Sequence, residues 1–274
     1  MIAFYDPQKH HLPFVYLRGS DFGLSALAYY ACSLWCLGYP EQAIQHSQEA
    51  LALAEELDHP FTLADVICYG GCMLSEMRQD YRDVLAKGEQ LDRLAQERVP
   101  AWKGTGILYR SLALIMLGQV HEGVAQMVQA NTITLSRGVR IDQIRMLYYL
   151  AWAYALENRV DKGLSKMDEL FDLVEQTAEH HYEADYHRLR GEMLLMQENE
   201  TAAEASFLKA IDIARRQSAR SWELRATISL ARLWQRQGRA NDAREWLAAI
   251  YGWFTEGFDT PDLMDARKLL AELV

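Results

Sequence analysis

The stretch LGYPEQAIQHSQEALALA, residues 37–54, sets a pattern that the rest of the chain repeats. Sliding it along the sequence aligns Ala43 with small or short apolar residues at steps of 39 to 41 positions: Val84, Gly123, Gly163, Ala203 and Ala243. A second row, of small residues, lies twelve positions earlier: Ala31, Cys72, Ser111, Ala151, Gly191 and Ala231. A third, apolar row lies seven positions later: Ala50, Leu91, Ala130, Leu170, Ala210 and Ile250. Three rows at one period indicate an internal repeat of about forty residues.

The three rows predict pairs of antiparallel helices that stack on one another. Helix backbones approach closely only where side chains are small, and the next pair must cover the remaining apolar face. Pro40 falls where a second helix would begin, and Gly38, Gly118 and Gly238 fall in the turns within pairs. The predicted pairs are 24–37/40–57, 62–78/81–97, 101–117/120–137, 141–156/160–178, 181–197/200–217 and 221–237/240–254.

The predicted fold is therefore all-α: a right-handed superhelical solenoid of about six helix pairs. A last helix after Thr260–Pro261, with Thr260 as its cap, would close the array. The predicted segments are an extended N-terminal segment 1–23, repeats 24–60, 61–99, 100–138, 139–179, 180–219 and 220–259, and a capping helix 260–274. The segment 1–23 is expected to contain the tail of a preceding repeat and a loop.

Composition limits the classes of function. Half of the 274 residues are hydrophobic, which excludes a disordered chain, and the net charge of −10 argues against nucleic acid as the main partner. The N-terminus lacks the basic and apolar segments of a secretory signal, and no apolar run is long enough for a membrane span. Four cysteines are too few for a disulfide framework, so we expect a cytoplasmic protein.

Two segments carry a resemblance to a known family. LWCLGYPEQAIQHSQEALALAEELDHPFTLA, residues 34–64, and the closing region 221–273, which includes YGWFTEGFDTPDL, resemble the C-terminal tetratricopeptide (TPR) arms of large bacterial regulators. In those regulators a class III adenylate cyclase or another output domain precedes a P-loop ATPase module and the repeats. The resemblance implies TPR-like repeats, a role in signal transduction, and upstream domains. The period of about forty exceeds the common 34 residues, which leaves HEAT-type repeats open on length alone.

The sequence contains no motif for catalysis. The phosphate-binding pattern G-x-x-x-x-G-K-[ST] is absent, so ATPase or cyclase activity is not carried over to these residues. HExxH and GxSxG are absent too. We therefore expect a non-enzymatic chain with no catalytic residues and no cofactor, either an excised arm or the product of a shortened gene.

Two clusters of metal-ligating residue types have simpler explanations. Cys32 and Cys36, with Cys68 and Cys72 on the next pair, have spacings that could form a zinc site, but free cysteines commonly pack as small apolar residues. The histidines 180, 181 and 187 lie at a predicted helix start without a convergent partner. We predict no metal site.

The first helices of the middle pairs present a candidate partner-binding groove. Its predicted lining is apolar, Met-rich and aromatic: Tyr69, Met73, Met77, Leu108, Leu112, Met116, Arg145, Tyr148 and Trp152. Such a concave face suits an amphipathic helix or an extended peptide. The alternative is that these residues are simply packed between neighbouring pairs.

Arginines concentrate between residues 215 and 244, where eight of them face only two acidic residues. The candidate anion-binding set is Arg188, Arg225, Arg232 and Arg236. Guanidinium groups on one face could hold an acidic peptide, a carboxylate or a phosphate. The alternative is a solvated face.

Aromatic residues crowd the C-terminal end: Trp246, Tyr251, Trp253, Phe254 and Phe258. They would seal the last pair against the capping helix, or else form a patch through which two copies associate.

The sequence thus predicts a scaffold that binds a protein or peptide, within its own polypeptide or outside it. The alternative is an anion-sensing regulatory arm.

Overall fold

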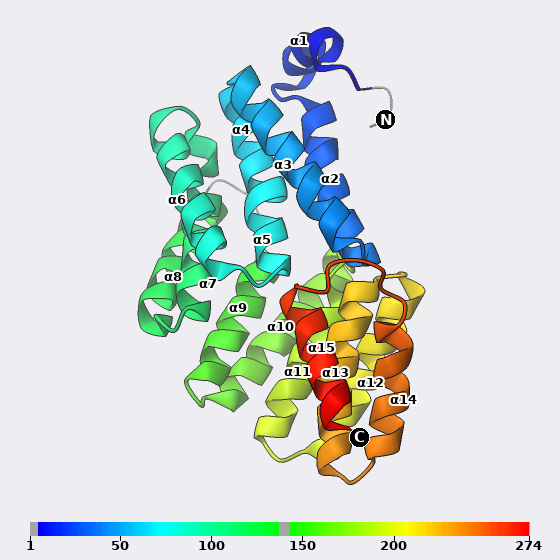
Figure 1. The fold of residues 1–274 in the computed structure, drawn as a ribbon. Coiled ribbons are helices and arrows are strands. Elements are labelled where there is room, and N and C mark those ends of the chain that lie inside the picture. The colour runs from blue at the N-terminus through cyan, green and yellow to red at the C-terminus, as the bar shows by residue number, and fades with distance from the viewer. Residues whose placement is uncertain (1–4, 137–142, 274) are drawn as a thin grey trace. The chain divides into compact units, whose positions relative to one another are not determined.

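The computed structural model describes residues 5–136 and 143–273, and within these ranges the regular elements are all helical (Figure 1). The helices are α1 (Pro7–Arg18), α2 (Phe22–Leu37), α3 (Pro40–Leu57), α4 (Pro60–Val66), η2 (Ile67–Met73), α5 (Leu74–Met77), α6 (Tyr81–Glu97), η3 (Pro100–Trp102), α7 (Lys103–Met116), α8 (Val120–Ser136), α9 (Gln143–Leu156), α10 (Val160–Thr177), α11 (Glu183–Met196), α12 (Glu200–Arg216), α13 (Arg220–Arg236), α14 (Ala240–Tyr251) and α15 (Pro261–Glu272). The predicted helix pairs match these bounds to within a few residues, apart from the ends that fall in 137–142, outside the described residues.

The chain divides into two compact units, which we describe separately. Unit 1 comprises Met1–Trp35 and Glu41–Gln143, and unit 2 comprises Cys36–Pro40 and Ile144–Val274. In unit 1, α6 packs on α7 and α7 on α8; in unit 2, α11 packs on α12, α12 on α13 and α13 on α14. Helices that follow one another therefore pack pairwise, which confirms the all-α prediction. The division into six repeats and the superhelical sense stay predictions.

The three rows of small and apolar residues are buried throughout, as their role in helix contacts requires. Gly123 of α8 shows why. A methyl group at this position would lie 2.7 Å from the carbonyl oxygen of Ser111 in α7, its counterpart in the second row. The backbones of α7 and α8 can approach this closely only without a side chain at Gly123.

The turns within the pairs share one backbone conformation. Gly38, Gly118 and Gly238 have φ values of 93°, 88° and 77°, in the left-handed region that glycine adopts freely. Asn158 and Glu198, at the equivalent positions of two other pairs, have φ values of 58° and 61°. The turn geometry is thus kept even where no glycine is present.

The first helix of the second pair differs from the prediction of one regular helix over 62–78. Residues Ile67–Met73 form a π-helix, η2, between α4 and α5. A π-helical turn accommodates one additional residue. This agrees with the step of 41 rather than 40 residues between Ala31 and Cys72.

The sequence predicts an extended segment over residues 1–23, but part of this segment is helical. Residues Pro7–Arg18 form α1, which begins at Asp6, whose carboxylate accepts a hydrogen bond from the Gln8 N–H, and ends at Gly19 in the left-handed conformation. Proline in the first turn and an acidic cap favour helix formation here. Residues 1–4 lie outside the described chain, as does the predicted repeat boundary at 138/139.

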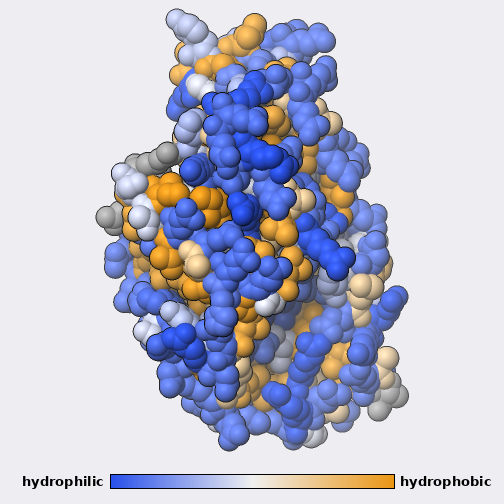
Figure 2. All heavy atoms as spheres, turned by 90° about the vertical axis from the view of Figure 1, so that its left-hand side faces the viewer, coloured by the Kyte–Doolittle hydropathy of each residue, from blue (hydrophilic) through white to orange (hydrophobic). Residues whose placement is uncertain are grey.

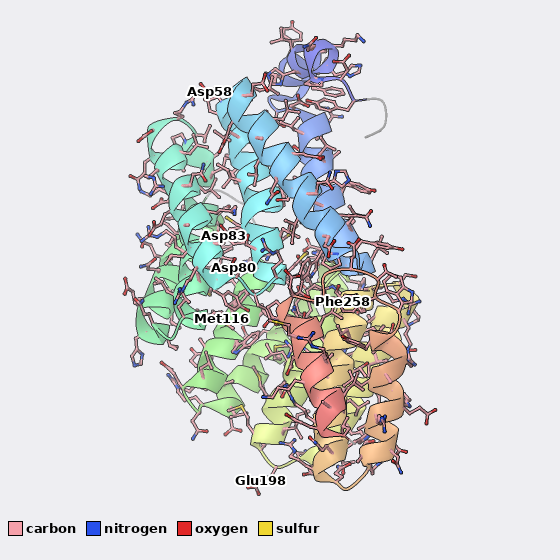
Figure 3. The ribbon with its side chains drawn as sticks, in the orientation of Figure 1. Asp58, Asp80, Asp83, Met116, Glu198 and Phe258 are labelled. Atoms are coloured by element: carbon pink, nitrogen blue, oxygen red, sulfur yellow. The ribbon has the colours of Figure 1, made fainter. Side chains whose placement is uncertain are left out.

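The capping helix α15 packs on α13 and α14. Thr260 occupies its N-cap with extended backbone angles, but its side chain makes no capping hydrogen bond, in contrast to Asp80, which accepts one from the Asp83 N–H at the start of α6 (Figure 3). Leu263, Ala266 and Leu269 of α15 join the core of unit 2. In the described ranges, none of the helices combines the length and apolarity needed to cross a membrane.

Candidate functional site

Unit 1 carries a cluster of partly exposed aromatic residues, here called the aromatic cluster: Tyr29, Phe61, Tyr69 and Trp102. The rings of Tyr29 and Tyr69 stack with centroids 4.2 Å apart, and the Trp102 ring lies edge-on to both Tyr69 and Phe61. Tyr29 is 44% exposed and Phe61 40% exposed. Three successive pairs of the array thus place aromatic surface in contact with solvent.

A carboxyl group lies beside the stacked tyrosines. Asp65 precedes Tyr69 by one helical turn, and the Ser25 hydroxyl donates a hydrogen bond to it. Burial raises the pKa of Asp65 above its ordinary value, and the Ser25 hydrogen bond opposes that shift in part. Burial, together with the Asp65 charge, raises the pKa of Tyr29 to about 12, so the phenol stays protonated. The cluster therefore combines π faces with an adjacent acidic group.

The π-helix η2 fixes the position of Tyr69. Two carbonyl groups of η2 accept hydrogen bonds from neighbouring elements: the Cys32 thiol donates to the Tyr69 carbonyl over 3.2 Å, and the Ser47 hydroxyl donates to the Gly70 carbonyl over 2.5 Å. The additional residue of a π-turn leaves carbonyls available for such partners. Cys32 thus serves as a buried hydrogen-bond donor.

In unit 2 the corresponding first helices are joined by polar side chains. The Tyr148 hydroxyl of α9 donates to Asp185 Oδ2 of α11 over 2.5 Å, and Arg188 Nε donates to Asp185 Oδ1 over 2.6 Å. All three residues are less than a tenth exposed. The Arg188 guanidinium lies over the Trp152 ring, 5.8 Å from its centroid.

Polar contacts also join the next helices of unit 2 toward the C-terminus. The Ser229 hydroxyl of α13 donates to Glu192 of α11 over 2.5 Å. Arg225 of α13 donates to both carboxylate oxygens of Asp262 in α15, and Arg232 pairs with Asp265. We call this set of contacts, from Tyr148 to Asp265, the polar ladder.

The buried members of the polar ladder are charged. Burial alone would raise the pKa of Asp185, but the Arg188 and Arg225 charges and two hydrogen bonds outweigh it and hold that pKa below its ordinary value. Burial would lower the pKa of Arg188, and the Asp185 carboxylate outweighs it, so the guanidinium stays protonated. These residues form internal ion pairs.

The predicted groove residues divide by exposure. Less than a tenth of the residue is exposed at five of them: Met73, Met77, Leu108, Leu112 and Tyr148. The other four are partly exposed: Tyr69, Met116, Arg145 and Trp152. Met116 lies at the end of α7 (Figure 3). Of the nine, only Tyr69 belongs to the aromatic cluster.

The predicted anion-binding arginines are mostly neutralised within unit 2. Arg188, Arg225 and Arg232 pair with the carboxylates of Asp185, Asp262 and Asp265. Arg236, at the end of α13, is exposed. An anionic ligand would have to displace internal carboxylates at three of the four positions.

The remaining sequence features lie as follows. Cys32, Cys68 and Cys72 are buried, Cys36 is partly exposed, and none of the four forms a disulfide. The described residues contain no group of three or more His, Cys, Asp or Glu side chains placed to hold a metal ion. Trp246 packs edge-on to Trp234, and Tyr251 to Phe258, which lies in the loop before α15 and is 40% exposed (Figure 3).

The aromatic cluster and the polar ladder had a sequence signal that we did not use. Tyrosine recurs at a spacing of forty, at Tyr29, Tyr69, Tyr109 and Tyr149. Alternating charges recur at the same spacing, at Arg145, Asp185, Arg225 and Asp265. The tyrosine row marks the Tyr29–Tyr69 stack. The charge row marks only the region of the polar ladder, because Arg225 pairs with Asp262 and Asp265 with Arg232.

Comparisons with known proteins extend the description of the fold. No protein-family model matches the chain, and no curated protein matches it. The crystal structure of Bacillus thuringiensis PlcR in complex with the peptide PapR7 and DNA is similar, with a TM-score of 0.60, 13% identity, and coverage of 74% of this chain and 71% of that one. A Rap protein complexed with Competence and Sporulation Factor matches with a TM-score of 0.60, 12% identity, and coverage of 91% and 79%.

A third structure, BtubC (BKLC) from P. vanneervenii, matches with a TM-score of 0.52, 13% identity, and coverage of 85% of this chain and 94% of that one. At these identities the likeness concerns the fold. The chain is an all-α protein with a TPR-like helical-repeat fold.

Proposed function

We propose that this chain is a non-catalytic, cytoplasmic TPR-like scaffold that binds a peptide or protein segment on the aromatic cluster of unit 1. The observation that carries the proposal is the exposed Tyr29–Tyr69 stack, with Phe61 and Trp102 beside it. Tyrosine and tryptophan contribute most to binding at interfaces, because they bury a large area and lose little rotamer freedom.

The adjacent acidic group narrows the chemistry of the partner. Asp65 lies close enough to Tyr29 and Tyr69 to perturb the pKa of both. A lysine or arginine side chain can contact an aromatic face and a carboxylate at once. We therefore propose a segment with a basic residue next to an apolar anchor.

Two similar structures support peptide or protein binding by this fold. PlcR is in complex with the peptide PapR7, and the Rap protein is complexed with Competence and Sporulation Factor. The proposal also includes the resemblance of this chain to the TPR arms of bacterial regulators. The bound segment would then belong to a bacterial signalling partner, or to ATPase or cyclase domains in the same polypeptide.

The polar ladder supports this assignment over an anion-sensing arm. Three of the four candidate arginines are already paired with aspartates, so their charges are used inside unit 2. In this proposal the ladder is structural. It joins successive first helices of unit 2 and leaves recognition to unit 1.

The experiment is a peptide-display selection against the full chain, followed by calorimetric titration of the selected peptides. The Tyr29→Ala/Phe61→Ala double variant should weaken binding by about tenfold or more, as loss of two aromatic anchors does. Tyr16→Ala on α1, an aromatic residue that is 91% exposed and lies outside the cluster, is the matched control and should bind normally. Equal affinity of the double variant, with its melting curve unchanged, would contradict the proposal.

A further inference from the structure

The outward face of α8 lacks charge. Five exposed residues follow one another along it at intervals of four, three, four and three positions, here called the α8 stripe: His121, Ala125, Val128, Thr132 and Leu135. Val128 is 54% exposed and Leu135 is 40% exposed. α8 lies in the part of unit 1 that Figure 2 turns toward the viewer, where hydrophobic atoms reach the surface among hydrophilic ones. This spacing is that of a helix seam that packs against another helix.

The same register on other second helices is charged. On α10 the equivalent exposed residues are Asp161, Ser165, Asp168, Asp172 and Glu175. On α6 they are Arg82, Ala86, Glu89, Arg93 and Gln96. The uncharged stripe is therefore a property of α8 and not of the repeat.

The positions that flank the α8 stripe are also nearly free of charge. They are Glu122, Val124, Gln129, Asn131 and Ser136, of which only Glu122 is ionisable. Gln126 donates a hydrogen bond to Glu122 over 3.1 Å on the same helix. Flanking charges set partner choice in paired helices, and here they would not repel a second α8.

We propose that the α8 stripe is the interface of a homodimer, in which two α8 helices pair antiparallel about a two-fold axis near Val128. The stripe is nearly symmetric about Val128, so Ala125 of one copy meets Thr132 of the other, and small residues oppose larger ones. Antiparallel pairing also places opposite helix dipoles together. Since the chain carries a net charge of −10, an uncharged face lets two copies meet without like-charge repulsion.

The length of α8 limits the size of the proposed interface. A helix of 17 residues is about 25 Å long, and one such pair buries less than the roughly 800 Å² per partner of a standard interface. We therefore expect a weak dimer that dissociates on dilution, with a dissociation constant on the order of micromolar or above. The interface does not use the aromatic cluster. A variant that no longer dimerises should therefore still bind the peptide, and a variant that no longer binds the peptide should still dimerise.

Sedimentation velocity of the full chain from about 5 to about 500 μM tests the proposal over the range of weak dimers. Wild type should pass from monomer to dimer, and Val128→Arg should raise the dissociation constant by about tenfold or more. Leu208→Arg is the matched control, since Leu208 is the equivalent residue of α12 and is 36% exposed. It should behave as wild type. A wild-type chain that stays monomeric, or equal behaviour of the two variants, would overturn the proposal.

A second measurement separates a weak dimer from a misfolded variant. Val128→Cys places one thiol near the proposed two-fold axis, so mild oxidation should yield a covalent dimer, whereas Leu208→Cys should not. Cys32, Cys68 and Cys72 are buried, and the partly exposed Cys36 is replaced by serine in both variants so that its thiol does not compete. Equal cross-linking of the two variants would contradict an interface centred on Val128.

Discussion

Arg225 and Asp262 form a forked ion pair between α13 and α15. Arg225 Nη2 donates to Asp262 Oδ2 over 2.6 Å, and Nε lies 3.1 and 3.2 Å from the two carboxylate oxygens. The side chains are 14% and 13% exposed. Two parallel hydrogen bonds between planar groups fix both distance and orientation. The capping helix is thus attached to the last repeat by a specific contact as well as by apolar packing.

Removal of Asp262 should destabilise unit 2 strongly. Asp262→Ala leaves the Arg225 charge buried without this partner, which costs about 3–5 kcal/mol. Arg232→Ala is the control, because the Arg232 side chain is 52% exposed and its pair with Asp265 is worth about 0.5 kcal/mol. Urea unfolding measures both. Equal losses in the two variants would contradict the structural role of the Arg225–Asp262 pair.

Gly123→Ala should lower the free energy of unfolding by about 1–3 kcal/mol, since a methyl group would lie 2.7 Å from the Ser111 carbonyl oxygen. Gly163→Ala provides a graded comparison. Its methyl group would lie 3.0 Å from the Ala151 carbonyl oxygen and 3.2 Å from the flexible Met193 side chain, so a smaller loss is expected. Thermal melting of both variants checks the order. The reverse order would argue against close approach of α7 and α8.

The left-handed turns predict changes of opposite sign at equivalent positions. A methyl group at Gly118 would meet nothing within 4 Å, so Gly118→Ala is strained only by its φ of 88° and should cost about 1 kcal/mol. Glu198 adopts a φ of 61° in the equivalent turn, and Glu198→Gly should stabilise by up to about 1 kcal/mol. Denaturant melts of both variants would reveal the sign. Destabilisation by Glu198→Gly would show that its side chain has another role.

His187 makes the stability of unit 2 depend on pH. Burial lowers its pKa to about 4, with Lys209 and Arg190 contributing, while its ring stacks on Phe171. An unfolded histidine titrates near 6.5, so the unfolded state binds more protons between pH 6.5 and 4. Stability is therefore fully present above about pH 6.5 and falls by roughly 1 to 3 kcal/mol as the pH drops toward 4.

The test compares the melting temperature at pH 7 and pH 5 in wild type and in His187→Gln. The glutamine side chain is neutral at both pH values. His187→Gln should lose less stability than wild type on acidification. His180→Gln is the control, since the His180 side chain is 42% exposed. A wild-type pH dependence retained in His187→Gln would assign the effect to other groups.

The fold could be predicted because close helix contacts demand small residues, and those recur at one period. The depth at which each side chain is buried could not be predicted from the sequence. Met73 and Leu112 belong to the predicted groove face, yet both are covered, because exposure depends on the neighbouring side chains as well as on register. The π-helix gave only a one-residue irregularity in the period.

The ion pairs of the Arg-rich region could not be predicted from neighbouring residues alone. The acids within this stretch are Glu223 and Asp242, whereas Arg225 pairs with a carboxylate 37 residues further on. In a repeat array the partner of a side chain can lie about one period away, as Asp262 does from Arg225. Charges therefore need to be compared across repeats.

Hydrogen–deuterium exchange of the full chain, with and without a display-selected peptide, tests the proposed binding role most directly. The proposal predicts slower exchange in residues 25–37 and 61–77, which carry Tyr29, Phe61 and Tyr69. Slower exchange confined to the second helices or to unit 2, with those two segments unchanged, would contradict it.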